Sequence, residues 1–258
     1  MKLHRQIIRA ARQGLLAAIL ATTLNTLVSA QDAAPAPIEE PVKPKWERSA
    51  SLGLTVTQGN ADTVLLTSNI LGLRKWDKNE VRLSADGTYG QNQSTTINES
   101  IRGSAQYNRI LFNDRAFFYG RADALHDGIA DVEYRLTLGP GAGYYFIKSD
   151  KTTLSAEAGP SFVTEKQGDI DNQYAALRLA ERFAHKLTDR ARVWQSAEVM
   201  PQVDDWDNFL IVGEVGIEAD LTEKLALRAF IQDTYDNAPA LGRNKNDLKL
   251  VTAIGYKF

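Results

Sequence analysis

The chain has 258 residues, no cysteine and a formal net charge of −2 at pH 7. A chain without cysteine cannot use a disulfide framework, so its stability has to come from strand pairing and packing. The slight acidic balance argues against nucleic acid as a partner, because a nucleic-acid-binding surface has to be basic. The mean hydropathy is below zero, which still allows a membrane barrel, since only alternate strand residues face lipid.

The first thirty residues have the three parts of a secretory signal peptide. An apolar stretch spans residues 15–28, and Val28-Ser29-Ala30 has the small-residue spacing of a cleavage site. The apolar stretch follows four basic residues, with no acidic residue among them: Lys2, Arg5, Arg9 and Arg12. Cleavage after Ala30 takes these four charges from −2 and leaves −6 on the mature chain. An uncleaved membrane anchor is the weaker alternative, because the apolar stretch is short.

The segment that follows, residues 31–45, is rich in proline. Proline interrupts helices and central strands, so this segment is expected to be an extended leader in the periplasm. We therefore expect three parts: a signal peptide over 1–30, the leader over 31–45, and a β-domain over 46–258.

From Trp46 onward the sequence alternates between apolar and polar residues, a period of two that predicts β-strands. The first alternating segment is 46–57 and the second is 63–76. Segments of about 10–14 residues suit tilted strands that cross a bilayer, whereas strands of soluble proteins average about 5–6. No apolar run after residue 30 approaches the ~20 residues that a membrane-spanning helix needs.

The breaks between segments are of two kinds, which alternate along the chain. Five are short and charged: 77–80, 112–115, 148–151, 187–190 and 221–224. Six are mostly longer and polar or glycine-rich: 58–62, 90–98, 126–131, 165–171, 202–207 and 236–246. Together they predict an all-β fold, a transmembrane antiparallel up-and-down barrel of twelve strands. Short turns on the periplasmic side and longer outer loops are typical of bacterial outer-membrane barrels.

The alternation also assigns faces. The first segment places Leu52, Leu54 and Val56 on one face. In the later segments these apolar positions should face lipid: Ala191, Val193, Ala197, Val199, Phe209, Ile211, Val215, Ile217, Leu225, Leu227, Ala229 and Ile231. A lipid-facing Arg or Lys at mid-depth costs about 2–4 kcal/mol, so charged neighbours should point into the lumen. Aromatic residues near segment ends suit interfacial girdles: Trp46, Trp76, Tyr107, Phe117, Phe118, Tyr144, Tyr145, Trp194, Trp206, Phe209, Tyr235, Tyr256 and Phe258.

The final segment, 247–258, places Ile254, Tyr256 and Phe258 on one face and then ends. An apolar final strand that ends on an aromatic residue is typical of outer-membrane barrels, and we interpret these three residues as an assembly signal. The expected partners are the barrel-assembly machinery, through this strand, and outer-membrane lipid, and we expect a monomer. The alternative for the whole chain is a soluble periplasmic β-sandwich that acts as a binding protein, in which this strand is an ordinary edge.

Two stretches carry a resemblance to a known family. Residues 46–63, W-E-R-S-A-S-L-G-L-T-V-T-Q-G-N-A-D-T, and residues 134–144, Y-R-L-T-L-G-P-G-A-G-Y, resemble the uncharacterised family of salt-induced outer membrane proteins of the YdiY type. The similarity covers essentially all of residues 46–258, and its most specific pieces are Gly59-Asn60 and the glycine-rich run 139–143. The resemblance implies an outer-membrane barrel in a Gram-negative bacterium and no chemistry, because the family has no established activity.

The candidate functional residues are charges expected in the lumen. They are Arg121, Asp123, Glu133, Arg135, Arg178, Glu181, Arg182, Glu198, Glu214, Glu218, Arg228 and Asp233. A mixed-charge lining favours a porin-like channel for small solutes. The alternative is a network of ion pairs that fills a closed barrel, which is the cheaper way to occupy an interior with charges. A structural or stress-related barrel would then use its outer loops, such as 236–246 with Arg243 and Lys245, to meet lipid phosphates.

An enzyme is the remaining class, as a lipid-modifying hydrolase with a Ser/His pair. After signal cleavage the histidines left are His126 and His185, and no G-x-S-x-G signature is present. We therefore expect no enzyme, no catalytic residue and no cofactor. Acidic residues of the outer loops lack the spacing of a calcium loop, so no metal site is expected either.

The run Gly139-Pro140-Gly141-Ala142-Gly143 superficially resembles a phosphate loop, but no Lys-Ser/Thr pair and no helix pattern follow it. Glycines inside a long strand more often permit bending or the close packing of a neighbour. Tyr144 or Tyr145 is the expected neighbour that covers them.

Overall fold

The computed structural model describes residues 45–58, 63–92 and 95–258. The expected signal peptide, nearly all of the leader and the Gly59-Asn60 turn lie outside the described residues. One short 3-10 helix, η1 (Phe112–Asp114), is the exception to an otherwise all-β fold within the described part of the chain. The described residues contain no helix that is both long enough and apolar enough to cross a membrane.

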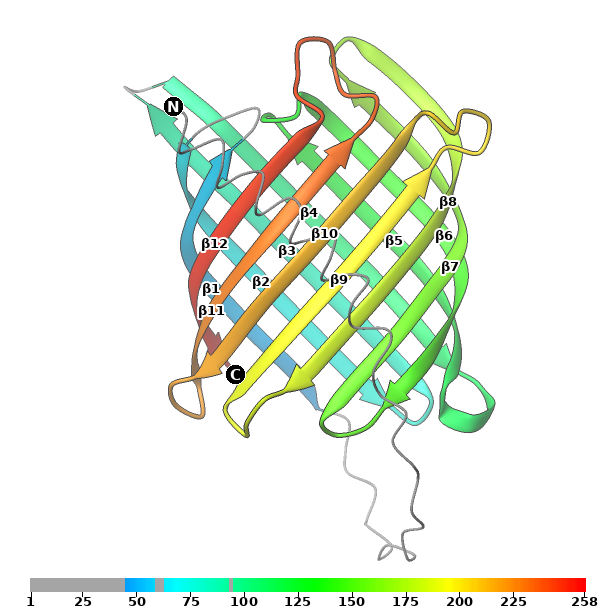
Figure 1. Ribbon diagram of the computed structural model, residues 1–258, viewed down its shortest axis with the longest axis vertical. Coiled ribbons are helices and arrows are strands. Elements are labelled where there is room, and N and C mark those ends of the chain that lie inside the picture. Colours follow the sequence, from blue (N-terminus) through cyan, green and yellow to red (C-terminus); the bar gives the residue numbers. More distant parts are fainter. Residues whose placement is uncertain (1–44, 59–62, 93–94) are drawn as a thin grey trace, which may run out of the picture. The chain divides into compact units, whose positions relative to one another are not determined.

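The described residues form twelve strands, each hydrogen-bonded to its neighbours in sequence (Figure 1). The strands are β1 (Trp46–Gln58), β2 (Thr63–Trp76), β3 (Asn79–Asn92), β4 (Thr95–Ile110), β5 (Ala116–Asp127), β6 (Val132–Lys148), β7 (Thr152–Gln167), β8 (Ile170–Lys186), β9 (Ala191–Pro201), β10 (Phe209–Asp220), β11 (Leu225–Asp236) and β12 (Asn246–Lys257). Every pairing is antiparallel, and β12 pairs with β1, which closes the barrel. The predicted closed barrel of twelve strands is confirmed, and a closed barrel leaves no unpaired strand edge.

The two faces of each strand differ as the alternation predicts. On β1, Leu52 points outward with 64% of its surface exposed, whereas Thr55 points inward and is fully buried. The same alternation holds on β12, where Leu250 and Ile254 are exposed and Val251 is buried between them. Apolar side chains therefore cover the outside of the barrel, and polar side chains share the interior with apolar ones such as Leu65 and Phe117.

The connections differ from the prediction at two of the longer loops. β3 continues to Asn92 and β4 begins at Thr95, so most of the expected loop 90–98 is strand. β7 and β8 are likewise separated by two residues, Gly168 and Asp169, where we expected a loop over 165–171. Main-chain hydrogen bonds do not require apolar side chains, so a polar hairpin can continue the ladder beyond the apolar belt. The connections 202–208 and 237–245 are the long ones among those described.

The glycine-rich run lies inside β6, and the aromatic residues that cover it come from β5. A Cβ atom at Gly141 would lie 2.2 Å from the ring of Tyr119, and one at Gly143 would lie 2.2 Å from the ring of Phe117. The expectation that Tyr144 or Tyr145 covers these glycines was therefore wrong. Both rings lie flat on the neighbouring strand because that strand has no side chain at the contact.

A second aromatic side chain uses the same device on the other side of the barrel. The Trp194 ring on β9 lies over Gly216 on β10, where a Cβ atom would come within 2.2 Å of it. Phe117 and Trp194 therefore line the interior, where we expected members of an outer aromatic girdle. Tyr107, Phe118, Tyr144 and Trp206 are exposed, as a girdle requires.

Candidate functional site in the barrel lumen

The interior of the barrel is lined by charged side chains that inward-facing strand positions supply. Of the candidate charges, these lie on inward-facing positions: Arg121, Asp123, Arg135, Arg178, Arg182, Glu198, Glu214, Glu218 and Arg228. Each alternates with outward residues of its own strand, as Arg178 does with the exposed Leu179. The remaining three candidates lie on the outer face.

A β-bulge explains Glu133. The pairing of β6 with β7 shifts between Val132 and Tyr134, and the shift turns the Glu133 side chain outward, where it is 61% exposed. There it forms an ion pair of 2.5 Å with Lys166. The expectation that Glu133 lines the lumen was wrong, because the extra residue of a bulge reverses the inward-outward order.

Glu181 and Asp233 also lie on the outer face, without any bulge. Glu181 alternates with Arg182 and shares its side of β8 with the exposed Leu179. Asp233 shares its side of β11 with Ile231 and accepts a hydrogen bond from Asn246 of β12. Both predictions of a lumen position were wrong, and the alternation within each strand already contained the correct face.

Arg178 is the centre of the most buried charge cluster in the lumen. Its guanidinium donates to Glu157 at 2.9 Å and to Glu198 at 2.8 Å, and its side chain is 2% exposed. Arg178 Nη1 also donates to the Tyr119 hydroxyl at 3.2 Å, and the guanidinium lies over the Tyr119 ring. Gly141 therefore contributes to this cluster indirectly, because it gives the Tyr119 ring the space to reach Arg178.

A second group of polar side chains extends the cluster toward β4 and β5. Arg121 makes two hydrogen bonds of 2.6 Å with the carboxylate of Asp123, and a third of 3.1 Å with Gln106 Oε1. The amide of Gln106 donates in turn to Glu157 at 3.0 Å. The β4, β5, β7 and β8 walls are thus joined by one continuous hydrogen-bonded network, which holds its charges in fixed positions.

The opposite wall carries its own network around Glu218 of β10. Arg192, Arg228 and Lys257 all lie within 3.2 Å of its carboxylate. Nearby, the indole of Trp194 donates to Glu214 at 2.6 Å, and the Arg228 guanidinium lies over the same indole ring. These contacts run through three neighbouring strands and the final strand β12.

Sequence reasoning missed several lumen charges. Glu80, Arg82, Glu157 and Glu165 lie on inward positions and take part in ion pairs. Their inward position could have been predicted, since each alternates with outward residues such as Val81 and Leu83. The ion-pair partner of each charge could not be predicted, because partners such as Arg178 and Glu157 are brought together by strand pairing.

Ion pairs link opposite walls near the strand ends that adjoin the longer connections. Lys249 of β12 lies 3.7 Å from Asp127 of β5, and Arg135 of β6 lies 3.6 Å from Asp236 of β11. The connection 237–245 adds a further link, because Arg243 lies 3.8 Å from Asp131. The lumen is therefore bridged at this end by side chains of both signs.

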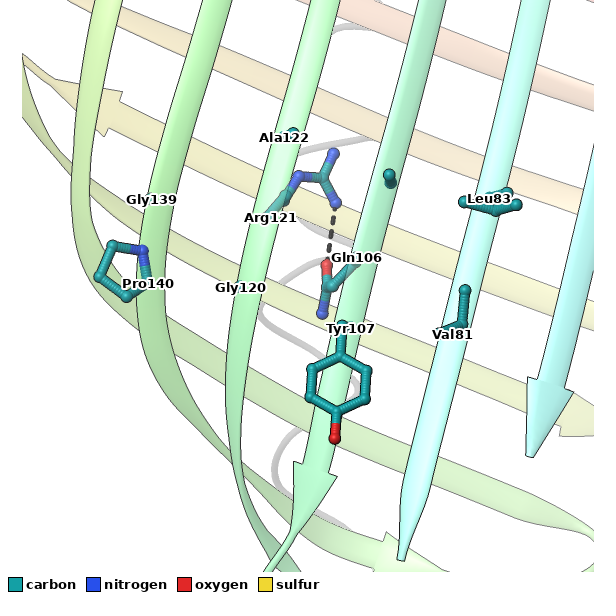
Figure 2. A pocket seen from close by; sticks show the side chains of 10 residues that line it. Val81, Leu83, Gln106, Tyr107, Gly120, Arg121, Ala122, Gly139 and Pro140 are labelled. Carbon is teal, nitrogen blue, oxygen red and sulfur yellow. Dashed lines mark hydrogen bonds between the residues drawn. The ribbon is translucent and has the colours of Figure 1, made fainter. Parts of the chain in front are cut away.

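A cavity of about 450 Å³ opens on the outer face of the wall formed by β3 to β6 (Figure 2). Small residues such as Gly120 and Ala122 leave it open, and larger apolar residues such as Leu83 and Tyr107 form its rim. The polar side chains that reach it, Arg121 and Gln106, are hydrogen-bonded to each other, as the dashed line in Figure 2 indicates. Its apolar outer rim suits an acyl chain of the surrounding lipid better than a polar solute.

The two candidate histidines lie far apart and have structural partners. His126 contacts the backbone oxygen of Glu133 at 2.8 Å and the carboxylate of Glu99 at 3.4 Å. His185 contacts the Thr152 hydroxyl at 2.8 Å, near the turn 187–190 at the other end of the barrel. Among the described residues no group of three or more His, Cys, Asp or Glu side chains is arranged to hold a metal ion.

The three residues of the expected assembly signal are exposed at the end of the chain, Ile254 and Tyr256 on β12 and Phe258 directly after it. Ile254, Tyr256 and Phe258 are each 44% to 58% exposed. The rings of Tyr256 and Phe258 stack at 6.0 Å, and the Arg48 guanidinium lies over the Phe258 ring. This apolar strip lies along the junction where β12 pairs with β1.

Residues 50–258 match the model of a family described as a protein of unknown function, DUF481. No curated protein matches the chain in sequence. The fold is similar to that of the NanC porin, with 6% sequence identity, 81% of this chain and 100% of the porin covered, and a TM-score of 0.57. It is also similar to the COG4313 outer membrane channel from Pseudomonas putida F1, with 8% identity, 87% and 100% coverage, and a TM-score of 0.52. At these identities the likeness concerns the fold, which is that of outer-membrane barrel channels.

Proposed function

We propose that this chain, which belongs to the DUF481 family of proteins of unknown function, is an outer-membrane channel. The solutes that it passes are small and polar. The observation that carries the proposal is the separation of the two faces. Apolar residues such as Leu52 and Ile254 are exposed on the outside, while charged side chains of both signs face the interior. The apolar outer face can contact the lipid of a bilayer, and the charged inner face can contact water and dissolved solutes.

The lumen has the chemistry of a selective lining. Asp123 and Arg121 keep 21% and 17% of their side-chain surfaces exposed, so the charges are within reach of a solute. Because ion pairs hold them in place, they can act on a passing ion without first reorganising. Neither histidine lies beside a serine nucleophile that the described contacts would activate, so we propose no enzymatic role.

The test is single-channel conductance of the refolded mature protein in a planar bilayer under a salt gradient. Arg228→Gln should shift ion selectivity toward cations, and Glu214→Gln should shift it toward anions, because each change removes one lumen charge. Glu181→Gln is the matched control, since it makes the same chemical change on the outer face and should leave selectivity unaltered. A silent bilayer with correctly folded protein would overturn the channel proposal.

A closed barrel of structural or stress-related role is the second candidate, and one observation favours it. The Lys249–Asp127 and Arg135–Asp236 pairs join opposite walls of the lumen. In that case the wild-type protein stays silent and Asp127→Asn with Asp236→Asn produces conductance, because the bridges are weakened. Equal conductance of the wild type and the double variant would count against this second candidate.

We further propose that the final strand directs assembly into the outer membrane as a monomer surrounded by lipid. The support is the exposed strip of Ile254, Tyr256 and Phe258 beside the junction with β1. Deletion of 256–258 should abolish membrane insertion, measured by cell fractionation and by the shift in gel mobility on heating. Normal insertion of the truncated chain would contradict the assembly role of this strip.

A further inference from the structure

Arg182 of β8 differs from the lumen arginines around it. Arg121, Arg178 and Arg82 each have a carboxylate within 2.9 Å, supplied by Asp123, Glu157 and Glu80 respectively. Within the described part of the chain, no carboxylate lies within 4.0 Å of the Arg182 guanidinium, and no hydrogen bond from it is formed. Its donors are therefore not used by the protein.

Several cationic side chains surround Arg182. Arg82, Arg121 and Arg178 act on it electrostatically, and so does the carboxylate of Glu157. Glu157 is already hydrogen-bonded to Arg178 and to Gln106. The site thus holds one more positive charge than its carboxylates can satisfy by direct contact.

The positive side chains come from different walls. Arg82 lies on β3, Arg121 on β5 and Arg182 on β8, and β3 is separated from β8 by four strands of the barrel. Their charges still interact, and those of Arg82 and Arg182 both act on Tyr145 of β6. Arg82, Arg121 and Arg182 therefore act on a common part of the lumen.

Arg182 is partly buried, and none of its nitrogen atoms is both fully buried and without a hydrogen-bond partner, so its guanidinium keeps some contact with water. A guanidinium presents five N–H donors in a planar fork that matches two oxygens of a carboxylate or a phosphate. An anion bound there would give Arg182 the negative partner that no carboxylate supplies to it by direct contact. Removal from bulk water strengthens such an interaction relative to the same contact on an open surface.

We propose that Arg182, with Arg82 and Arg121 facing it, is a binding site in the lumen for small oxyanions with two oxygens available on one side. This inference rests on the proposed channel and names the class of solute that the channel would pass. Organic carboxylates and inorganic phosphate both carry the required pair of oxygens. The anion lies between the walls and accepts hydrogen bonds from the Arg182 fork. Glu157 keeps Arg178 occupied, so Arg182 remains free to bind the solute.

The test is isothermal titration of the whole refolded barrel in detergent with malonate and, separately, with inorganic phosphate. Arg182→Gln should weaken binding at least tenfold, about 1.4 kcal/mol. Arg192→Gln, on the neighbouring strand β9 and paired with Glu218, should leave affinity within about twofold, because a 50%-exposed charge is already screened by water. Stronger binding of one probe than of the other identifies the source.

Arg182→Lys is a second variant in case Arg182→Gln does not fold. It keeps the positive charge at this position and removes the planar guanidinium. Its affinity should fall between those of the wild type and Arg182→Gln. Equal affinity of all the folded variants, or no binding of either anion to the wild type, would overturn the site. If the protein conducts in a planar bilayer and neither anion blocks the current, the anion site is wrong and the channel proposal stands. If the protein binds an anion but never conducts, the channel proposal is wrong and the anion site stands.

Discussion

Two charged residues of β8, Arg178 and Glu181, lie three positions apart on opposite faces of the barrel. Arg178 faces inward, is 2% exposed and has two carboxylate partners. Glu181 faces outward beside Leu179 and accepts a hydrogen bond of 3.3 Å from an amide, Gln195 Nε2. The same strand thus carries a charge that its surroundings neutralise and a charge that its surroundings oppose.

The difference shows that the partners available to a charged residue depend on whether it faces the lumen or the outside of the barrel, even within one strand. On the inner face, neighbouring strands contribute charges of opposite sign, so each additional charge can find a partner. On the outer face the neighbours are apolar, and a carboxylate has to be satisfied locally or remain costly. Substitutions on the two faces should therefore act in opposite directions.

The largest effect is expected on the inner face. Arg178→Leu leaves Glu157 and Glu198 without their cation in a buried site, and should lower the free energy of unfolding by about 3–5 kcal/mol. The measurement is denaturant unfolding of the barrel in lipid vesicles. Arg192→Leu is the control, because its half-exposed ion pair should cost about 1 kcal/mol or less. Equal losses for the two variants would contradict the central position of Arg178.

The glycines of the wall should give the next effect. Gly141→Val would collide with the Tyr119 ring, displace it from Arg178 and cost about 1–3 kcal/mol by overpacking. Gly120→Val makes the same change on the outer face of β5, where a Cβ atom meets nothing within 4 Å. Unfolding of both variants under the same conditions separates the two cases. Equal stability of the two variants would show that the aromatic-glycine contact does not contribute.

The smallest effect should have the opposite sign. Glu181→Leu together with Gln195→Leu removes the polar pair from the outer face and should raise the free energy of unfolding by up to about 2 kcal/mol. Thermal unfolding in vesicles gives the comparison with the wild type. If the double variant is less stable, lipid does not cover this patch, and a second protein chain becomes the expected contact.

Much of the fold was readable because a barrel repeats one simple rule. The second strand was predicted over 63–76, and the structure has it at Thr63–Trp76. Short turns and alternating faces were equally local, so the strand number and the outward position of residues such as Ile217 followed from them. The expected loop over 165–171 failed, because hydrogen bonding between strands continues where the apolar pattern ends.

The candidate site was less readable, for reasons that differ from residue to residue. Glu181 and Asp233 could have been assigned to the outer face from the alternation within their own strands. Glu133 could not, because the bulge beside it exists only in the pairing of β6 with β7. Tyr119 and Phe117 were placed over the glycines by strand register, which no local pattern encodes.

The sequence by itself determined the period of two, the number of strands and the set of side chains available to each face. These are local properties, since successive side chains of a strand must point to opposite sides. The tertiary structure alone decided which charges meet, because partners such as Arg178 and Glu157, or Lys249 and Asp127, come from different strands. The registers of β8 with β7 and β9 decide which side chains Arg182 meets, and they leave it without a direct carboxylate partner among the described residues.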